Sequence, residues 1–427
     1  MSRLNTVCAL DLGTTKVCCA VAEYDGEDLH ILGLGEVPTR GIRKGAVVDI
    51  DLAAEAVAEA VDAAEQVAGV PIDAVVAGFS GGRITSANSR GVVAVAGARR
   101  EVRASDIERV LEAARAISVP SDQRIVHVLP QQFTVDGQEG VKDAIGMSGS
   151  RLEVDAHIIM GSNTALNNVI KVAHAAGLEV EDVALQGIAS AEAVIQEEEM
   201  ERGVVVADIG GGTTDIAIYR KGSLISTSVI PVGGNHVTGD LAVGLRCDLD
   251  AAEEVKRRAG HCLQLTVPAD VMITMTPMGY DDTVQVPARY LAEIIGPRAR
   301  EMAMLIQQAI TKTGPASLYA GGVVLTGGGS LLRGFPEVVQ QETDLPCRVA
   351  APFDVDGIGH EMRDPQYATL VGLLRWGTRS IRVAHVKGRK QQRSLNITGT
   401  NRHNQTQVSE RLSRWFRDLF TPSTKGD

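Results

Sequence analysis

A short glycine- and threonine-rich pattern occurs twice in this chain. The first copy centres on Asp-Leu-Gly-Thr-Thr-Lys over 11–16, and the second centres on Asp-Ile-Gly-Gly-Gly-Thr-Thr-Asp over 208–215. In each copy, runs of Val, Ile and Ala of strand length flank the turn residues, which is typical of a β-hairpin. Since an internal repeat indicates a repeated structural unit, the pattern predicts two related lobes.

The segments after the first hairpin alternate between helix and strand, as in α/β folds. The sequence predicts a helix over 52–68 that ends at Gly69, a strand over 74–79, a helix over 164–176 and a strand over 180–185.

A long segment over 83–160 interrupts this alternation in the first lobe. The capping-box pattern of Ser105 and Glu108 predicts the start of a helix, and strand-like runs lie over 124–133 and 153–160. We interpret the segment as an inserted subdomain.

A second insertion is predicted over 226–312. It contains expected helices over 251–259 and 289–310. We expect Pro297 to end or kink the latter, because proline lacks the N–H group that continues a helix.

Length and composition fit at least two domains. The chain has 427 residues, 44% of them hydrophobic, and single cores rarely grow beyond about 250–300 residues. No run approaches the roughly 18 apolar residues of a spanning helix, and residues 1–6 lack the regions of a signal peptide, so we expect a cytosolic protein.

We interpret the six cysteines as buried free thiols rather than disulfides or a metal site; they are Cys8, Cys18, Cys19, Cys247, Cys262 and Cys347.

Charge is unevenly distributed along the chain. Residues 387–427 carry nine Lys or Arg against three Asp or Glu, a local +6, which leaves −17 for the remainder of a chain with net charge −11. An acidic body argues against nucleic-acid binding, which needs clustered basic residues. The polar run over 387–407 is nearly free of large apolar side chains, and we expect a flexible linker there.

The two hairpins have residue types suited to holding a polyphosphate between two lobes. Glycine and threonine let backbone N–H groups and hydroxyls approach phosphate oxygens closely. Asp11 and Asp208 can then hold Mg²⁺ through waters, and Lys16 can neutralise terminal phosphate charge. The alternative for either copy alone is an ordinary hairpin with a glycine turn.

Two further glycine-rich turns carry a weaker signal. The run Val323-Val-Leu-Thr-Gly-Gly-Gly-Ser follows a predicted strand and opens a helix, which is also common in tight α/β connections. Pro231-Val-Gly-Gly-Asn precedes another helix start, so it can present further N–H groups to phosphate.

Five motifs in a fixed order carry a family resemblance. They are DLGTTK, then LQGIASAEAV over 185–194, DIGGGTTDIAI, LTGGGSLLRG, and YATLVGLL over 367–374. The order resembles the actin, Hsp70 and sugar-kinase superfamily and, within it, the FtsA family of bacterial cell-division proteins, over 6–376 and in the type of tail. The resemblance implies an α/β, two-lobed, actin-like fold, a duplicated ribonuclease H-like fold with an inserted subdomain in each lobe.

The resemblance also implies ATP and Mg²⁺ as ligands. The residues it assigns to the ATP site are Gly13, Thr14, Thr15, Lys16, Gly210, Gly211, Gly212, Thr213, Gly234, Asn235, Glu253, Lys256, Gly327, Gly328 and Gly329.

Hydrolysis is a separate expectation from binding. Asp11, Gln186 and Asp208 are the candidate catalytic residues, and Gln186 occupies the position where superfamily members place a residue that orients water. Many relatives read Glu-Pro where this chain reads Gln186-Gly187. We therefore expect at most slow ATP turnover.

The resemblance assigns subdomains to the chain. In the family nomenclature they are 1A over 1–82 and 162–195, 1C over 83–161, 2A over 196–225 and 306–362, 2B over 226–305, a return to lobe 1 over 363–386, the linker over 387–407 and an amphipathic helix over 408–420.

The implied partners are the C-terminal peptide of the tubulin-like protein FtsZ on 2B, late division proteins on 1C, and further copies of the chain in a filament. Arg289, Arg298 and Arg300 are candidates to meet the acidic part of the peptide, and a solvated helix face is the alternative.

The segment 408–420 places its apolar residues on one helical stripe. The stripe includes Leu412, Trp415, Phe416, Leu419 and Phe420, flanked by Arg411, Arg414 and Arg417 that can meet anionic lipid headgroups. A helix docked on its own protein or a partner is the alternative. Burial of each large apolar side chain is worth about 1.5–3 kcal/mol, so one tail should bind reversibly and many tails on a polymer should bind by avidity.

Together these features predict an actin-like ATP-binding protein that polymerises and anchors FtsZ filaments to the inner membrane during division. It should lie peripherally on the cytoplasmic face at the division site. The alternatives are an actin-like membrane scaffold for pilus or cell-shape machinery, and a small-molecule kinase of the same superfamily.

Overall fold

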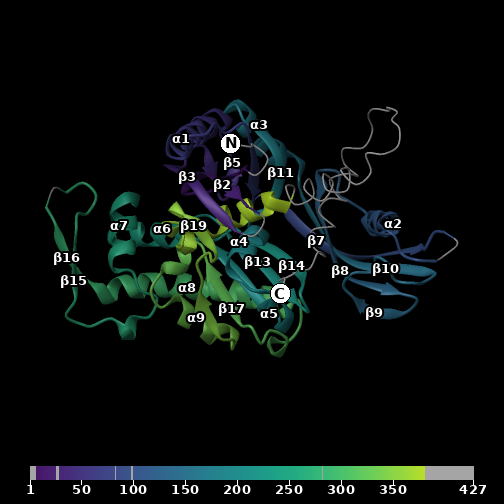
Figure 1. Ribbon diagram of the computed structural model, residues 1–427. Helices are drawn as coiled ribbons and strands as arrows, with labels where there is room; N and C mark the ends of the chain where they lie inside the picture. The colour runs from purple at the N-terminus through teal and green to yellow at the C-terminus, as the bar shows by residue number, and fades with distance from the viewer. Residues whose placement is uncertain (1–5, 26–27, 82, 98–99, 281, 380–427) are drawn as a thin grey trace.

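Two mixed β-sheets with matching topology form the centres of two lobes (Figure 1). The computed structural model describes residues 6–379 except 26–27, 82, 98–99 and 281. The first sheet has the order β11-β6-β1-β2-β3 with β19 at its edge, and the second has the order β14-β13-β12-β17-β18. In each, three antiparallel strands continue into two parallel ones, so the predicted duplication is confirmed.

The strand bounds agree closely with the predicted hairpins. The first sheet comprises β1 (Thr6–Leu12), β2 (Lys16–Tyr24), β3 (Leu29–Pro38), β6 (Ala74–Phe79), β11 (Glu179–Leu185) and β19 (Val355–Gly357). The second comprises β12 (Val204–Ile209), β13 (Thr214–Arg220), β14 (Ser223–Ile230), β17 (Val323–Thr326) and β18 (Cys347–Val349). A short pair, β4 (Ile42–Arg43) and β5 (Ala46–Val47), follows β3.

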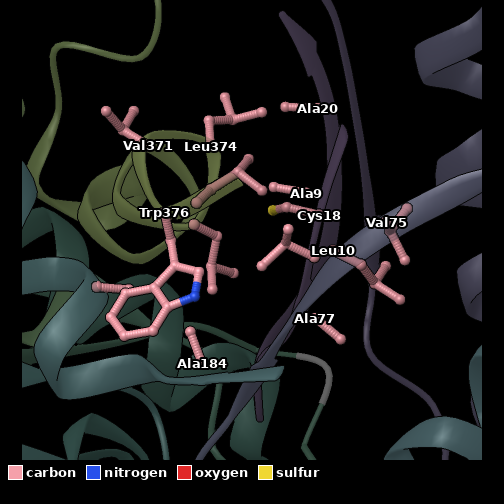
Figure 2. Packing of buried hydrophobic residues seen from close by; sticks show 14 of the residues in the cluster. Ala9, Leu10, Cys18, Ala20, Val75, Ala77, Ala184, Val371, Leu374 and Trp376 are labelled. Atoms are coloured by element: carbon pink, nitrogen blue, oxygen red, sulfur yellow. The ribbon is translucent and has the colours of Figure 1, made fainter. Parts of the chain in front are cut away.

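Small residues let helices lie close to the first sheet. A Cβ atom at Gly35 of β3 would lie 1.9 Å from the carbonyl oxygen of Ala60 in α1, so glycine is required for this approach. The helices of this lobe are α1 (Ile50–Ala68), α3 (Asn163–Ala175), α4 (Gln186–Val194) and a helix over 368–379. Figure 2 shows Val371, Leu374 and Trp376 of this last helix packed in the buried cluster that contains the strand residues Ala9 and Ala20.

The helices of the second lobe are α5 (Glu197–Arg202), α6 (Gly234–Leu245), α7 (Leu249–Ala259), α8 (Ala288–Thr311) and α9 (Phe335–Thr343). A second buried cluster joins α6, α8 and α9 to this sheet. The 3-10 turns are η2 (Gln264–Thr266), η3 (Ala316–Leu318), η4 (Gly328–Leu331), η5 (Ile358–His360) and η6 (Pro365–Tyr367).

The segment between β6 and α3 forms a separate antiparallel sheet with its own core, at the right of Figure 1. Its order is β7-β10-β8-β9. The helix α2 (Ala104–Arg115) packs on β7 (Ile84–Ala94), β8 (Gln123–Val135) and β10 (Arg151–Ser162), while β9 (Gln138–Val141) lies at the edge. The predicted capping box is wrong: Arg103 is the N-cap, and Asp106, not Glu108, accepts from its N–H group at 3.0 Å.

The second insertion differs from its predicted form in two ways. β14 stays paired with β13 as far as Ile230, so 226–230 belong to the lobe-2 sheet. α8 continues through Pro297 as one helix. The hairpin of β15 (Met272–Met275) and β16 (Val284–Pro287) projects at the left of Figure 1.

The chain returns to the first lobe earlier than expected. β19 pairs in parallel with β3, so the return begins at Val355 rather than at residue 363. No helix among the described residues is long and apolar enough to cross a membrane. All six cysteines are free thiols; four are buried, and Cys8 and Cys347 are partly exposed.

Candidate functional site

The turns of the two hairpins face each other at close range. A Cβ atom at Gly211 would lie 2.1 Å from Thr15 Oγ1, and one at Gly212 would lie 2.8 Å from Thr14 Oγ1. Only glycine at these two positions permits such an approach between the lobes.

A cleft of about 620 Å³ lies between the lobes and is lined by residues of both. Almost all of the predicted site residues line it: Asp11, Gly13, Thr14, Thr15, Lys16, Gln186, Asp208, Gly210, Gly211, Thr213, Gly234, Asn235, Glu253, Lys256, Gly327, Gly328 and Gly329. The exception is Gly212, which lies against Thr14 and Lys44 instead. Residues far apart in the sequence therefore meet at one place.

The hairpin turns supply backbone donors. Within the described part of the chain, the N–H groups of Thr14, Thr15, Gly211 and Gly212 have no hydrogen-bond acceptor. Such groups can bind phosphate oxygens.

The turn before α6 does not add donors, contrary to expectation. The N–H groups of Gly234 and Asn235 donate to the carbonyl oxygens of Gly210 and Gly211 at 2.9 and 2.8 Å. These bonds hold the start of α6 against the second hairpin, so this turn supports the hairpin instead of facing a ligand with its N–H groups.

Three aspartates converge on the cleft from the two hairpins. Asp11 accepts from Gln186 Nε2 at 2.6 Å. Asp208 accepts from Ser190 Oγ and from Thr369 Oγ1, the latter at 2.9 Å. Asp215 accepts from Ser80 Oγ at 2.7 Å and from Thr213 Oγ1 at 3.1 Å.

Burial disfavours the charged form of these carboxyl groups. Desolvation and then the charge of Asp208 raise the pKa of Asp11 to about 7. Desolvation is also the main cause that raises the pKa of Asp215 to about 7 and the pKa of Asp208 above its usual range. A cation at this place would favour all three ionised carboxylates.

Lys16 is already paired at the mouth of the cleft. Its Nζ lies 2.7 Å from Glu36 Oε2, 3.1 Å from Gln366 Oε1 and 3.8 Å from the ring centre of Tyr367. Tyr367 also donates to Glu36 at 2.8 Å. Partial burial opposes ionisation of Glu36, but the hydrogen bonds from Lys16 and Tyr367 lower its pKa overall.

The far wall of the cleft is built by α6, α7 and the turn after β17. Lys256 Nζ lies 2.5 Å from Glu253 Oε2 and 2.9 Å from Thr238 Oγ1. Gly327, at φ 78°, lies so close to Asp208 that a Cβ atom would be 2.2 Å from its Oδ1. The following segment is the 3-10 turn η4, not the start of an α-helix as expected.

Comparison with known proteins assigns the chain to a family. A family model described as cell division protein FtsA matches residues 205–372, and a model of the SHS2 domain inserted in FtsA matches residues 81–160. The cell division protein FtsA of Pseudomonas aeruginosa is 38% identical over 97% of this chain and 98% of its own length. This chain belongs to the FtsA family.

Other FtsA proteins and more distant folds agree with this assignment. FtsA of Bacillus subtilis is 38% identical over 90% of the chain and 85% of its own length, and FtsA of Escherichia coli K12 is 36% identical over 88% and 90%. The fold is actin-like. A structure of the PilM–PilN type IV pilus biogenesis complex matches with a TM-score of 0.62 and 19% identity, over 87% of this chain and 98% of the other. MreB5 of Spiroplasma citri bound to ADP matches with a TM-score of 0.56 and 15% identity, over 89% and 98%.

Several cleft residues of this FtsA-family chain were not predicted. Asp215 pairs directly with Asp208 in the hairpin register, whereas Cys18 takes the same position opposite Asp11. The second motif contains both residues of this pair, so it carries a signal for the pairing. Ser190 lies one helical turn after Gln186, so its contact with the cleft was also readable, whereas the long-range positions of Glu36 and Thr369 carried no local signal.

The cleft fits a cation held indirectly. Among the residues that the structure describes, no three His, Cys, Asp or Glu side chains lie close enough together to bind a metal ion. Magnesium keeps most of its waters and uses one or two carboxylates with substrate phosphates. The raised pKa values of Asp11 and Asp215 fit a place that a hydrated cation would stabilise.

The three candidate partner arginines are unequally available. Arg298 forms two hydrogen bonds with Asp240, at 2.7 and 3.1 Å, and also pairs with Glu301. Arg289 donates to the carbonyl oxygen of Val267 at 2.7 Å. Arg300 is exposed and pairs with Glu342 at 3.1 Å.

The predicted linker and the predicted membrane residues over 408–420 lie outside the described residues.

Proposed function

We propose that this FtsA-family chain binds ATP with Mg²⁺ between its two lobes. The observation that carries the proposal is the pair of glycine-threonine turns facing each other beside Asp11 and Asp208. Unpaired N–H groups suit phosphate oxygens, and the two carboxylates suit a hydrated cation. ATP bound there would supply a charged polyphosphate that both lobes can hold.

Titration of the full chain with a fluorescent ATP analogue, with Mg²⁺ or with EDTA, tests this proposal. We expect saturable binding that needs Mg²⁺ and is lost in Gly211→Ala, because the new Cβ atom would meet Thr15 Oγ1. Gly239→Ala is the matched control, since nothing lies within 4 Å of its Cβ position. Absence of saturable binding at millimolar ATP in the wild type would refute the proposal.

We further propose slow ATP turnover. Gln186 is tied to Asp11, and a residue that orients water contributes to phosphoryl transfer mainly through position. Phosphate release by the wild type should fall at least several-fold in Gln186→Ala. If the pure wild-type protein releases no phosphate, ATP acts as a binding switch instead.

The same proposal covers the role in division: the chain polymerises and anchors FtsZ filaments to the inner membrane. Membership of the FtsA family supports it. The segment 231–305 is the proposed 2B subdomain, with its start moved to follow β14, and 83–161 is the proposed 1C subdomain. Exposed Met278, Tyr280 and Tyr290 on the former give apolar surface for a peptide.

Binding of a labelled FtsZ C-terminal peptide to the full chain tests this role. Arg300→Glu should weaken binding at least several-fold, because it replaces an exposed positive charge that is a candidate to meet the acidic part of the peptide. Arg202→Glu, an exposed and similarly paired arginine on α5, should leave binding unchanged. No binding by the wild type would favour the pilus or cell-shape scaffold.

A further inference from the structure

A buried histidine joins the inserted four-stranded sheet to the first lobe. His127 lies on β8 and is 8% exposed. Its Nε2 accepts a hydrogen bond from the backbone N–H of Leu185 at 3.1 Å. Leu185 is the last residue of β11 and the N-cap of α4.

The helix held in this way carries side chains to both sides of the cleft. Gln186, its first residue, donates to Asp11 in the first lobe, and Ser190 donates to Asp208 in the second. α4 also contacts strands of both sheets. Gln186 therefore directly follows the residue whose N–H group donates to His127.

The other side of His127 packs against the helix over 368–379. Its ring lies 5.0 Å from the ring of Trp376, and Trp376 Nε1 donates to Asp182 of β11 at 3.0 Å. Trp376 and Ala184, both labelled in Figure 2, belong to the same buried cluster. This packing restricts movement of the His127 ring away from the N–H group of Leu185.

The inserted sheet also contacts the second lobe, at β14. The Nε2 atom of His157 on β10 lies 3.2 Å from Thr227 Oγ1, and the Nε2 group of Gln131 on β8 donates to the carbonyl oxygen of Leu224 at 2.9 Å. The sheet thus spans both lobes, and a change in their relative position would act on it.

We propose that His127 is a positioning residue that ties the inserted sheet to α4, so that the position of this sheet sets the geometry of Gln186 and Asp11 in the cleft. The link between His127 and α4 is supported by the contacts above, whereas its effect on ATP rests on the proposed function.

The chemistry of the ring suits this role. An acceptor at Nε2 requires a neutral imidazole. Burial is the main cause that lowers the pKa of His127 to about 4, although Asp182 opposes it. Arg379 also faces this region and adds to the lowering. The hydrogen bond therefore persists at neutral pH.

Two substitutions of His127 and one matched control test the proposal in the full chain. His127→Leu removes the acceptor, while His127→Gln returns an acceptor oxygen near the Nε2 position. Val154→Ala is the control: it removes apolar contacts of a buried residue that belongs to the core of the inserted sheet alone.

Amide hydrogen exchange of the peptide over 183–194 is the first measurement, with ATP affinity and phosphate release as the second. His127→Leu should speed exchange in this peptide about tenfold, as expected for loss of one buried hydrogen bond. ATP affinity or turnover should fall several-fold as well. His127→Gln should restore most of both, and Val154→Ala should change neither while it lowers thermal stability.

Unchanged exchange over 183–194 in His127→Leu, or an equal increase in Val154→Ala, would overturn the proposal. If His127→Leu does not fold, His127→Asn, whose shorter amide does not reach the Nε2 position, serves in its place. If the wild type binds no ATP, the proposed function fails, but the exchange measurement still tests whether His127 holds the start of α4.

Discussion

At the scale of single residues, the cleft holds charged groups in places that oppose stability. Three carboxyl groups with raised pKa values line the same cleft, and Lys16 forms an ion pair with Glu36. Sequence patterns located Asp11 and Asp208 because each begins a glycine turn. They did not reveal that Asp240 occupies Arg298, since that pair joins residues 58 positions apart.

Asp215→Asn should stabilise the protein without nucleotide at high pH. The pKa of Asp215 is about 7 in the folded protein, against an ordinary value of 3.8, so ionisation penalises the folded state increasingly as pH rises from about 4 to 7, and fully above 7. The gain above pH 7 should be on the order of 4 kcal/mol, and it should vanish near pH 4.

Thermal unfolding of both proteins at several pH values measures the gain. Stabilisation by Mg²⁺ and ATP should fall in the variant, because the negative charge near the cation is lost. A gain that is constant between pH 4 and 8 would contradict the raised pKa.

Glu36→Gln and Lys16→Ala should change ATP affinity in opposite directions. Lys16 must leave Glu36 to reach a phosphate, so removing the carboxylate charge should raise affinity roughly threefold to tenfold. Lys16→Ala should lower it more than tenfold. Titration with the fluorescent ATP analogue measures both, and a parallel loss in the two variants would mean that Glu36 itself supports the ligand.

At the scale of elements, local patterns predicted helices and strands well where the ends carry their own signals. α1 ends at Gly69 in the left-handed conformation, as expected. α8 does not end at Pro297, because it buries apolar residues on both sides of the proline, including Ile295, Ala299 and Met302. Burial of several such side chains offsets the roughly 3 kcal/mol of an internal proline.

Contacts between elements were beyond local patterns. The pairing of β19 with β3 joins residues more than 300 positions apart, and neither strand has a motif that identifies its partner. The close contact between α4 and the helix over 368–379 also joins distant parts of the chain, at Ala189 and Gly372, and no local pattern identifies it.

Gly372→Ala should disrupt the contact between these two helices. A Cβ atom there would lie 1.8 Å from the carbonyl oxygen of Ala189, and overpacking of this kind costs about 1–3 kcal/mol or more. Gly239→Ala, inside α6 with open space around its Cβ position, should instead stabilise the protein by up to about 1 kcal/mol.

Chemical denaturation of the two variants and the wild type tests this pair. Loss of stability in both variants would show that helical glycine is required for reasons other than helix contact.

At the scale of the whole molecule, the duplicated hairpin predicted the two lobes, and interruptions of the helix–strand pattern predicted the insertions, which the family resemblance also implies. The sequence did not indicate that the inserted sheet contacts both lobes, because those contacts use single polar side chains on different strands. Charge is also divided at this scale, with an acidic body of −17 and a basic terminal segment of +6.

Deleting 408–420 should abolish sedimentation with anionic liposomes and leave ATP affinity unchanged. In the proposed membrane helix the apolar stripe would supply most of the binding energy, and the residues that line the cleft lie elsewhere in the sequence. Replacing Arg411, Arg414 and Arg417 with glutamine keeps the stripe, so this variant should bind anionic liposomes more weakly and lose most of its sensitivity to salt. Wild-type sedimentation should increase with ATP if polymers present many tails at once. Full sedimentation of the deletion variant would contradict the assignment and point to a membrane contact elsewhere on the chain.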